Sequence, residues 1–259
     1  MIIKEEFERL VPSFRDCEDE IFDSIEPYLQ KVENDIRREF DLQPPGYPSQ
    51  DIEERFNAYL AKRGAYEALP HLDLILTSNG FAVVSNQNLT PASRQRVYDL
   101  REKLRREKSD ARDRLMQELD ASGFYAPTNL LWCPTLVRKY GIRTKDGNMV
   151  YEEEMQLVQT DIDAAQHHCA MIVSEEQMTE LVSMQETMFY RDLTELCRRY
   201  MAAHVKGDNN AIRLMTHNLQ HYLNENADAL PAYKSSSKYE ADHFTPYENK
   251  RHDPTFFFG

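Results

Sequence analysis

Apolar residues recur every three or four positions along most of this chain, the spacing that places them on one face of an α-helix. The segment from Asp16 to Asp41 shows this spacing clearly and contains Pro27. Pro27 either kinks the helix or begins a second helix at its first turn. The apolar face comprises Ile21, Ile25, Tyr28, Leu29, Val32, Ile36 and Phe40. A long helix with one buried face is therefore expected in this part of the chain.

The stretch QPPGYPS, residues 43–49, breaks the helical pattern with prolines and a glycine. Ser49 is a residue type that caps helices, and Asp51 and Glu53 after it suit the positive end of a helix dipole. A second helix is therefore predicted from this point to about Arg63.

The segment from Leu69 to Val97 is the most apolar and least charged part of the chain. Its Asn79-Gly80 pair lies between apolar runs, which is the usual signal for a two-residue hairpin. The apolar residues before it instead have helical spacing. This spacing favours a helix that stops at Asn79-Gly80, with Phe81 folded back on its last turn. We expect this helix rather than the hairpin, followed by a short extended segment near residues 81–86.

The longest predicted helix begins at Thr90 and Pro91 and runs to about Ala121, where Gly123 ends it. Thr90 would cap this helix, Pro91 would take its first position and Ser93 would lie in its first turn. Its predicted core face comprises Val97, Leu100, Leu104, Ala111, Leu115 and Leu119.

Basic residues follow one flank of that core face. They could bind phosphates, or they could pair with the two acidic segments, residues 1–54 and 148–195, within the chain or across a subunit boundary. The net charge of −13 argues against general binding to DNA or RNA and favours the pairing. These candidate interaction residues are Arg94, Arg101, Arg105 and Arg112.

The second half of the chain returns to helical spacing after an irregular stretch. Residues 123–148 hold Trp132, prolines and an Asp-Gly turn, and are expected to connect two helical domains, residues 1–122 and 149–234. Residues 235–259 show no period and are expected to form an extended tail. The later helices are predicted at about Tyr151–Ser174, Glu175–Val205 and Asn209–Asn224, with a turn at Lys206-Gly207-Asp208. These patterns predict an all-α, or nearly all-α, protein in two helical halves.

The composition is ordinary for a globular protein, with 41% hydrophobic and 29% charged residues. No run of apolar residues is long enough to span a membrane, and the first residues lack the pattern of a signal peptide. A cytoplasmic location is therefore expected. The four cysteines form no CxxC pair and are expected to be reduced, partly buried thiols. They are Cys17, Cys133, Cys169 and Cys197.

One group of residues has the spacing of metal ligands. His217, His221 and Glu225 lie at i, i+4 and i+8, on one face of a predicted helix. A tetrahedral site needs a further ligand, which no sequence feature marks, so exposed histidines are the simpler interpretation. In the run His167, His168 and Cys169, each residue points about 100° away from the one before it on a helix, so these side chains cannot converge on one ion.

Other chemical signatures give no catalytic residue. The acidic runs Glu152–Glu154 and Glu175–Glu176 are interpreted as solvated helix starts, favoured by the helix dipole. The sequence contains no GxSxG, Walker or GxGxxG motif. No cofactor, small-molecule substrate or catalytic group is therefore predicted.

The end of the sequence carries three consecutive phenylalanines, Phe256, Phe257 and Phe258. Such a run is costly to leave in water, so these side chains are expected to dock. They pack either on the chain's own body or on a neighbouring subunit.

The run LDLILTSNGFAVVSNQNLTPASRQRV, residues 72–97, resembles the signature of an uncharacterised family encoded in prophages and phage-like elements of gut bacteria. The signature has a helix ending in Leu-Thr, a Gly-Phe, an extended piece, an Asn, and Pro-Ala-Ser before a long arginine-bearing helix. The matching residues are Leu76, Thr77, Gly80, Phe81, Val84, Asn88, Pro91, Ala92 and Ser93.

Proteins of this family resemble head–tail connector, or head-completion, proteins, which form a ring between the portal of a phage capsid and the tail. The resemblance implies a non-catalytic virion component whose partners are copies of itself and portal or tail proteins. An acidic ring does not adhere to the DNA it surrounds, and complementary faces suit neighbours in a ring. Two alternatives stay open: a metal-dependent enzyme that uses His217, His221 and Glu225, and a cytoplasmic protein-binding module that uses the basic helix.

Overall fold

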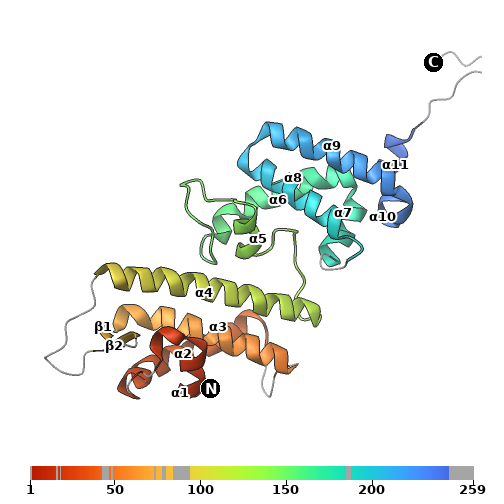
Figure 1. Cartoon of the computed structure of the whole chain (residues 1–259). Coiled ribbons are helices and arrows are strands. Elements are labelled where there is room, and N and C mark those ends of the chain that lie inside the picture. Colours follow the sequence, from red (N-terminus) through yellow and green to blue (C-terminus); the bar gives the residue numbers. More distant parts are fainter. Residues whose placement is uncertain are drawn as a thin grey trace, which may run out of the picture. The chain divides into compact units, whose positions relative to one another are not determined.

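The computed structural model describes residues 2–15, 17, 19–42, 47, 49–72, 74–77, 80–83, 94–184 and 188–244. The chain forms two compact units (Figure 1). The N-terminal unit comprises Met1–Pro127 and Leu131–Val158, and the C-terminal unit comprises Thr128–Leu130 and Gln159–Gly259. Most of the predicted connector, from residue 131 onward, is therefore part of the N-terminal unit, which differs from the predicted domain boundaries.

Three long helices form the body of the N-terminal unit, with α3 packed against both α2 and α4 (Figure 1). Its elements are α1 (Lys4–Leu10), η1 (Pro12–Phe14), α2 (Asp19–Glu39), α3 (Gln50–Ala68), η2 (Leu69–His71), β1 (Leu74–Thr77), β2 (Gly80–Val83), α4 (Arg94–Ala121) and α5 (Pro134–Lys139). The described residues are predominantly α-helical with one two-stranded hairpin, which confirms the predicted nearly all-α class.

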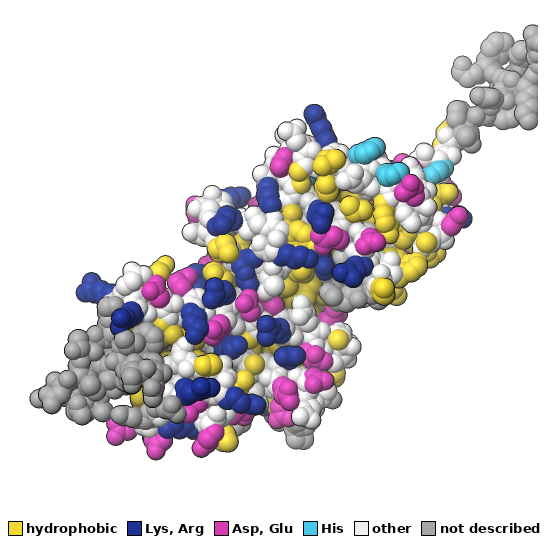
Figure 2. Space-filling view, viewed as in Figure 1, with side chains coloured by type: hydrophobic (Ala, Val, Ile, Leu, Met, Phe, Trp, Pro, Cys, Tyr) yellow, Lys and Arg dark blue, Asp and Glu magenta, His cyan; other side chains and the backbone are white. Residues whose placement is uncertain are grey.

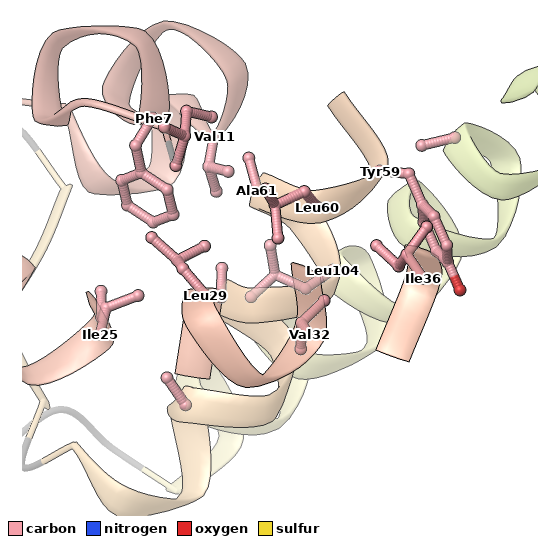
Figure 3. Close-up of a cluster of buried hydrophobic side chains, with 14 of the residues drawn as sticks. Phe7, Val11, Ile25, Leu29, Val32, Ile36, Tyr59, Leu60, Ala61 and Leu104 are labelled. Carbon is pink, nitrogen blue, oxygen red and sulfur yellow. The ribbon is translucent and has the colours of Figure 1, made fainter. Parts of the chain in front are cut away.

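The apolar periodicity correctly predicted the buried faces of α2 and α4. Pro27 lies inside α2, and the chain forms one helix across it. The predicted α4 core positions from Leu100 to Leu119 are buried, while Val97 is partly buried against the same cluster. Figure 3 shows side chains of α1, α2, α3 and α4 meeting in this core.

Helix α3 begins at its predicted cap and continues beyond its predicted end. The Ser49 hydroxyl accepts a hydrogen bond from the Ile52 amide at 3.2 Å. The helix then runs five residues past Arg63, to Ala68. Gly64 lies on its buried face, where a Cβ atom would overlap the Leu29 side chain of α2. The missing side chain therefore lets the two helices approach closely.

The predicted helix stop at Asn79-Gly80 is wrong. Strands β1 and β2 pair antiparallel, with Thr77 opposite Gly80, so Gly80 and Phe81 belong to a strand. The chain leaves helical geometry at the turn that contains Pro70. The Leu-Ile-Leu-Thr and Gly-Phe-Ala-Val sequences that follow are rich in residues that favour strands, and this outweighed a short stretch of helical spacing.

Several predicted positions in this region lie outside the described residues. They are Asn79, the predicted helix cap Thr90, the first-turn Pro91 and Ser93. The described part of α4 begins at Arg94. Its end is as predicted, because Gly123 adopts a left-handed φ of 75° and the Phe124 amide bonds back to the Leu119 carbonyl.

The C-terminal unit is a compact set of helices around α8. Its elements are α6 (Met155–Val173), whose first residues lie in the N-terminal unit, α7 (Glu175–Ser183), α8 (Arg191–Lys206), α9 (Asn209–Asn226), η3 (Ala227–Ala229), α10 (Pro231–Lys234) and α11 (Ser237–Asp242). Gly207 has a left-handed φ of 68° and Asp208 caps α9, which confirms the predicted turn.

The single helix predicted from Glu175 to Val205 is in fact two helices. Leu181 of α7 and Leu193 of α8 are both fully buried. In one unbroken helix, residues twelve positions apart would point about 120° apart, because each residue turns the helix by about 100°. The break after Ser183 lets α7 and α8 take different directions, so that both leucines can be buried.

The predicted tail is partly helical, since α11 occupies Ser237–Asp242 and is capped by Ser236. Phe256, Phe257 and Phe258 lie outside the described residues. Among the helices that the structure describes, none combines the length and apolar character needed to cross a lipid bilayer.

Candidate functional site

A cluster of ion pairs surrounds one flank of α4 in the part of the N-terminal unit that the structure describes. Arg105 pairs with Glu154 and lies 3.7 Å from Glu153, and the Lys108 ammonium lies 2.5 Å from the Glu153 carboxylate. Because Glu152–Glu154 directly precede α6, these pairs fix the start of that helix on α4. We call these residues, together with Arg112, Glu39, Glu152, Tyr59 and Arg63, the α4 charge cluster.

Arg112 extends the cluster to α2. Its guanidinium lies 2.6 Å from Glu39 and 3.7 Å from Glu152. The two carboxylates come from the two acidic segments of the sequence, residues 1–54 and 148–195. The predicted pairing of the arginine-rich segment with the acidic segments is therefore confirmed for Arg105 and Arg112, and it occurs within one chain.

Tyr59 of α3 is a buried hydroxyl at the centre of the cluster. It donates a hydrogen bond to Glu152 at 2.9 Å and accepts one from Arg63 at 3.2 Å. Arg63 also pairs with Glu39 at 3.4 Å. Burial, and then the negative charge of Glu152, raise the pKa of Tyr59 well above its usual value. Tyr59 is therefore a neutral donor that links α3 to the segment before α6.

Lys108 is the buried cation of the cluster, with 5% of its surface exposed. Its ammonium lies 4.5 Å from the centre of the Tyr66 ring, a cation–π contact. Burial alone would raise the pKa of Glu153, but the hydrogen bond and charge of Lys108 lower that pKa below its usual value. The Glu153 carboxylate is therefore held in its ionised form by its contact with the lysine.

Sequence reasoning missed Lys108 and misinterpreted its acidic partners. Lys108 lies three residues after Arg105 and four before Arg112, so the spacing of the basic flank contained the signal. Glu152–Glu154 are not a solvated helix start, because α6 begins at Met155 and all three carboxylates pair with α4. Glu175 and Glu176 do form the exposed first turn of α7, as predicted.

The geometry of the cluster suits a structural role. Two of its buried polar atoms, Arg105 Nε and Glu152 Oε2, make no hydrogen bond among the described residues. Each still lies near an opposite charge: Arg105 Nε is 3.7 Å from Glu153, and Glu152 Oε2 is 3.8 Å from Lys108. Since Arg105, Lys108 and Arg112 are each neutralised by carboxylates of the same chain, they form no cationic cradle for a phosphate.

The other candidate arginines lie outside the ion pairs of the cluster. Arg101 is exposed, and its guanidinium lies 5.6 Å from the centre of the Tyr66 ring. Arg94 is exposed at the first described position of α4. The α4 flank therefore divides into an exposed N-terminal part and a paired C-terminal part.

His217, His221 and Glu225 lie on the exposed face of α9. The two imidazole rings are parallel with centres 6.4 Å apart, and His221 lies 3.4 Å from Glu225. Within the described residues, no three His, Cys, Asp or Glu side chains are grouped as metal ligands would be. The predicted helix face is present, but these side chains do not converge on one point.

The adjacent residues His168 and Cys169 point to different neighbours, as the helical geometry predicts. His168 stacks on His204 of α8 with ring centres 4.5 Å apart, and Cys169 lies beside Cys197. Burial, followed by the hydrogen bond with Cys197, raises the pKa of the Cys169 thiol. All four cysteines are free thiols with buried side chains, more buried than predicted.

The link between α7 and α8 exposes large apolar side chains. Met188 is 89% exposed and Phe189 is 61% exposed. The ring of Phe189 packs edge-on against Tyr190, with ring centres 4.8 Å apart, and Tyr190 is buried. Tyr190 thus anchors the link while Phe189 faces solvent. Sequence reasoning missed this feature because the link was predicted to be helical.

Comparison with known proteins matches part of the chain to a protein family. Residues 26–128 match a family described as being of unknown function (DUF6712). The match covers less than half of the 259 residues of the chain. This span contains α3, the hairpin and α4, so it includes the segment 72–97 and the basic side of the α4 charge cluster. No curated protein and no solved structure matches the chain.

Proposed function

We propose that this protein is a structural component of a virion of head–tail connector type, which acts by binding copies of itself and neighbouring virion proteins. The proposal assigns it no catalytic step. The observation that carries the proposal is the exposed apolar link of the C-terminal unit, with Met188 and Phe189 in solvent.

Exposed apolar side chains of this size favour a protein partner. Aromatic residues and methionine are enriched at protein interfaces, and burying one removes apolar area from water. The contact between Phe189 and the buried Tyr190 limits the motion of the exposed ring. A side chain that is already held in place loses less conformational entropy on binding, so the link suits a docking role.

The α4 charge cluster supports the same function. Its cations are neutralised by carboxylates of the same chain, and its hydrogen bonds join α2, α3, α4 and the segment before α6. Such cross-links within the N-terminal unit suit a structural component, because they leave the paired cations of α4 no free charge for a substrate. The resemblance of residues 72–97 to the prophage-encoded family supplies the virion context of the proposal.

A pair of matched variants tests the role of the link. Met188→Ser with Phe189→Ser removes its exposed apolar groups, while Phe124→Ser removes a phenylalanine that is 59% exposed on the N-terminal unit. We expect the first variant to lose binding to the portal protein in co-sedimentation and the second to bind like the wild type. Equal binding by all three proteins would contradict the proposal, and circular dichroism checks that both variants fold.

A further inference from the structure

The link between α7 and α8 shares an anchor with the short helix α10. A hydrogen bond joins the Tyr190 hydroxyl, at the end of the link, to the side chain of Gln177 in α7. The carbonyl oxygen of the same side chain accepts a hydrogen bond from the Tyr233 backbone amide of α10 at 3.2 Å. Gln177 is fully buried. One buried side chain therefore holds both the link and α10.

Tyr233 also holds α11, because its hydroxyl donates a hydrogen bond to Asp242 at 3.4 Å. A path of hydrogen bonds thus runs from Tyr190 to Asp242 through only two side chains. Since each hydrogen bond joins atoms about 3 Å apart, the two ends of this path lie within about 20 Å of each other. Phe244, the last described residue, follows two positions later. The chain therefore leaves the described residues within reach of the link.

Exposed apolar side chains gather at the link. Met184 is 46% exposed, Met188 is 89% exposed and Phe189 is 61% exposed, and these three lie within six residues of sequence. Figure 2 shows hydrophobic side chains over the part of the C-terminal unit where Figure 1 places α7 and α10. A methionine thioether packs favourably against an aromatic ring. The three side chains therefore form an apolar surface that suits aromatic groups.

We infer that this surface is the docking site of the chain's own aromatic cluster, Phe256–Phe258. Three consecutive phenylalanines are costly to leave in water, and so are the exposed methionines and Phe189 of the link. The docking deepens the proposed function and rests on its assignment of the link as a contact surface. The aromatic cluster occupies the link until a neighbouring virion protein displaces it.

The length of chain before the cluster allows this contact within one molecule. Phe256 follows Phe244 by 12 residues. A segment of that length reaches up to about 40 Å when fully extended, which exceeds the separation of about 20 Å estimated above. A short tether also gives the cluster a local concentration on the order of millimolar. Another copy supplies that concentration only in a millimolar solution, so at micromolar protein the chain's own cluster occupies the link.

Oxidation of methionine by hydrogen peroxide, followed by peptide mass spectrometry, measures whether the link is covered. The comparison variant carries Phe256→Ser, Phe257→Ser and Phe258→Ser. We expect Met188 to oxidise at least about threefold faster in this variant, because the cluster no longer covers it. Met171, which is 60% exposed on α6, should oxidise at one rate in both proteins.

Protection within one chain does not depend on protein concentration, so it should be the same at about 1 μM and about 100 μM. Equal oxidation rates of Met188 in the two proteins would overturn the docking. Protection that develops only at the higher concentration would overturn docking within one chain.

Paired cysteines test the position of the cluster, since all four native thiols are buried. Oxidised glutathione should convert a Met184→Cys, Thr255→Cys variant into a monomer with an internal disulfide. The control is a Leu214→Cys, Thr255→Cys variant, because Leu214 is 56% exposed on α9 of the same unit. We expect the control to cross-link at least about fivefold more slowly, as its thiol lies away from the docked cluster.

Equal cross-linking rates would show a cluster that is tethered but not docked, and would overturn the inference. Covalent dimers in place of the internal disulfide would also overturn it. Neither measurement uses the portal protein. Either failure therefore leaves the proposed function standing, while loss of that function is detected separately by co-sedimentation.

Discussion

The Tyr59 hydroxyl and the Glu152 carboxylate are joined by a hydrogen bond of 2.9 Å, although 93 residues separate them in sequence. This bond connects α3 to the segment before α6. Tyr59→Phe removes the donor and leaves a partly buried carboxylate without it, which costs about 1–3 kcal/mol. We expect the free energy of unfolding, measured by urea denaturation, to fall by that amount. Tyr98→Phe, at an exposed position of α4, should leave it unchanged.

The Lys108–Glu153 pair tests whether the α4 charge cluster acts as a unit. A double-mutant cycle of Lys108→Met and Glu153→Gln should show a coupling energy above about 1 kcal/mol, because the lysine is buried and the carboxylate is half-buried. The same cycle at Lys103–Glu107, 3.9 Å apart, where the lysine side chain is 46% exposed, should give at most about 0.5 kcal/mol. Equal coupling energies in the two cycles would show that burial of the lysine does not strengthen its interaction with the carboxylate.

Because Gly64 lies close to Leu29, the effect of a substitution at Gly64 on stability should depend on the side chain at position 29. Gly64→Ala inserts a methyl group into the contact between α2 and α3, and overpacking of this kind costs about 1–3 kcal/mol. In a Leu29→Ala background the space is free, so the same change should be neutral or stabilising through its higher helix propensity. Thermal unfolding of the wild type, the two single variants and the double variant measures the effect of Gly64→Ala in each background. A similar loss in both backgrounds would contradict the packing.

His204 gives the C-terminal unit a predicted dependence on pH. Burial, with a smaller effect of His168, lowers its pKa below the ordinary value of 6.5. The unfolded chain therefore takes up a proton more readily, so stability is unaffected by this group above pH 6.5 and declines as pH falls through the folded pKa. His204→Gln should reduce the loss of thermal stability between pH 7 and pH 5. His71→Gln, in the N-terminal unit, should leave that loss as it is in the wild type.

Local periodicity predicted those parts of the fold that depend on near neighbours in sequence. The buried face of α2, the Ser49 cap and the core face of α4 each follow from residues within a few turns of one another. The hairpin was missed because the apolar residues leading into its first strand, Leu69, Leu72 and Leu76, are three and four positions apart, as in a helix. In so short a segment, β propensity and the turn at Pro70 decided the outcome.

The polar site was only partly predictable. The flank of basic residues on α4 was visible in the sequence, and so was their attraction to acidic segments. Which carboxylate each residue meets depends on contacts such as Lys108 to Glu153, 45 residues apart, which no local pattern specifies. The exposed link at Met188 and Phe189 was missed for a related reason, since the local apolar spacing does not show that the chain leaves the helix between α7 and α8.

The central claim is that this chain functions by assembling with other virion proteins. Native mass spectrometry of the chain purified together with its portal and tail neighbours tests this claim most directly. We predict complexes that contain several copies of the 30.4 kDa chain and at least one neighbour. A chain that remains at 30.4 kDa, both alone and in the presence of those neighbours, would contradict the account.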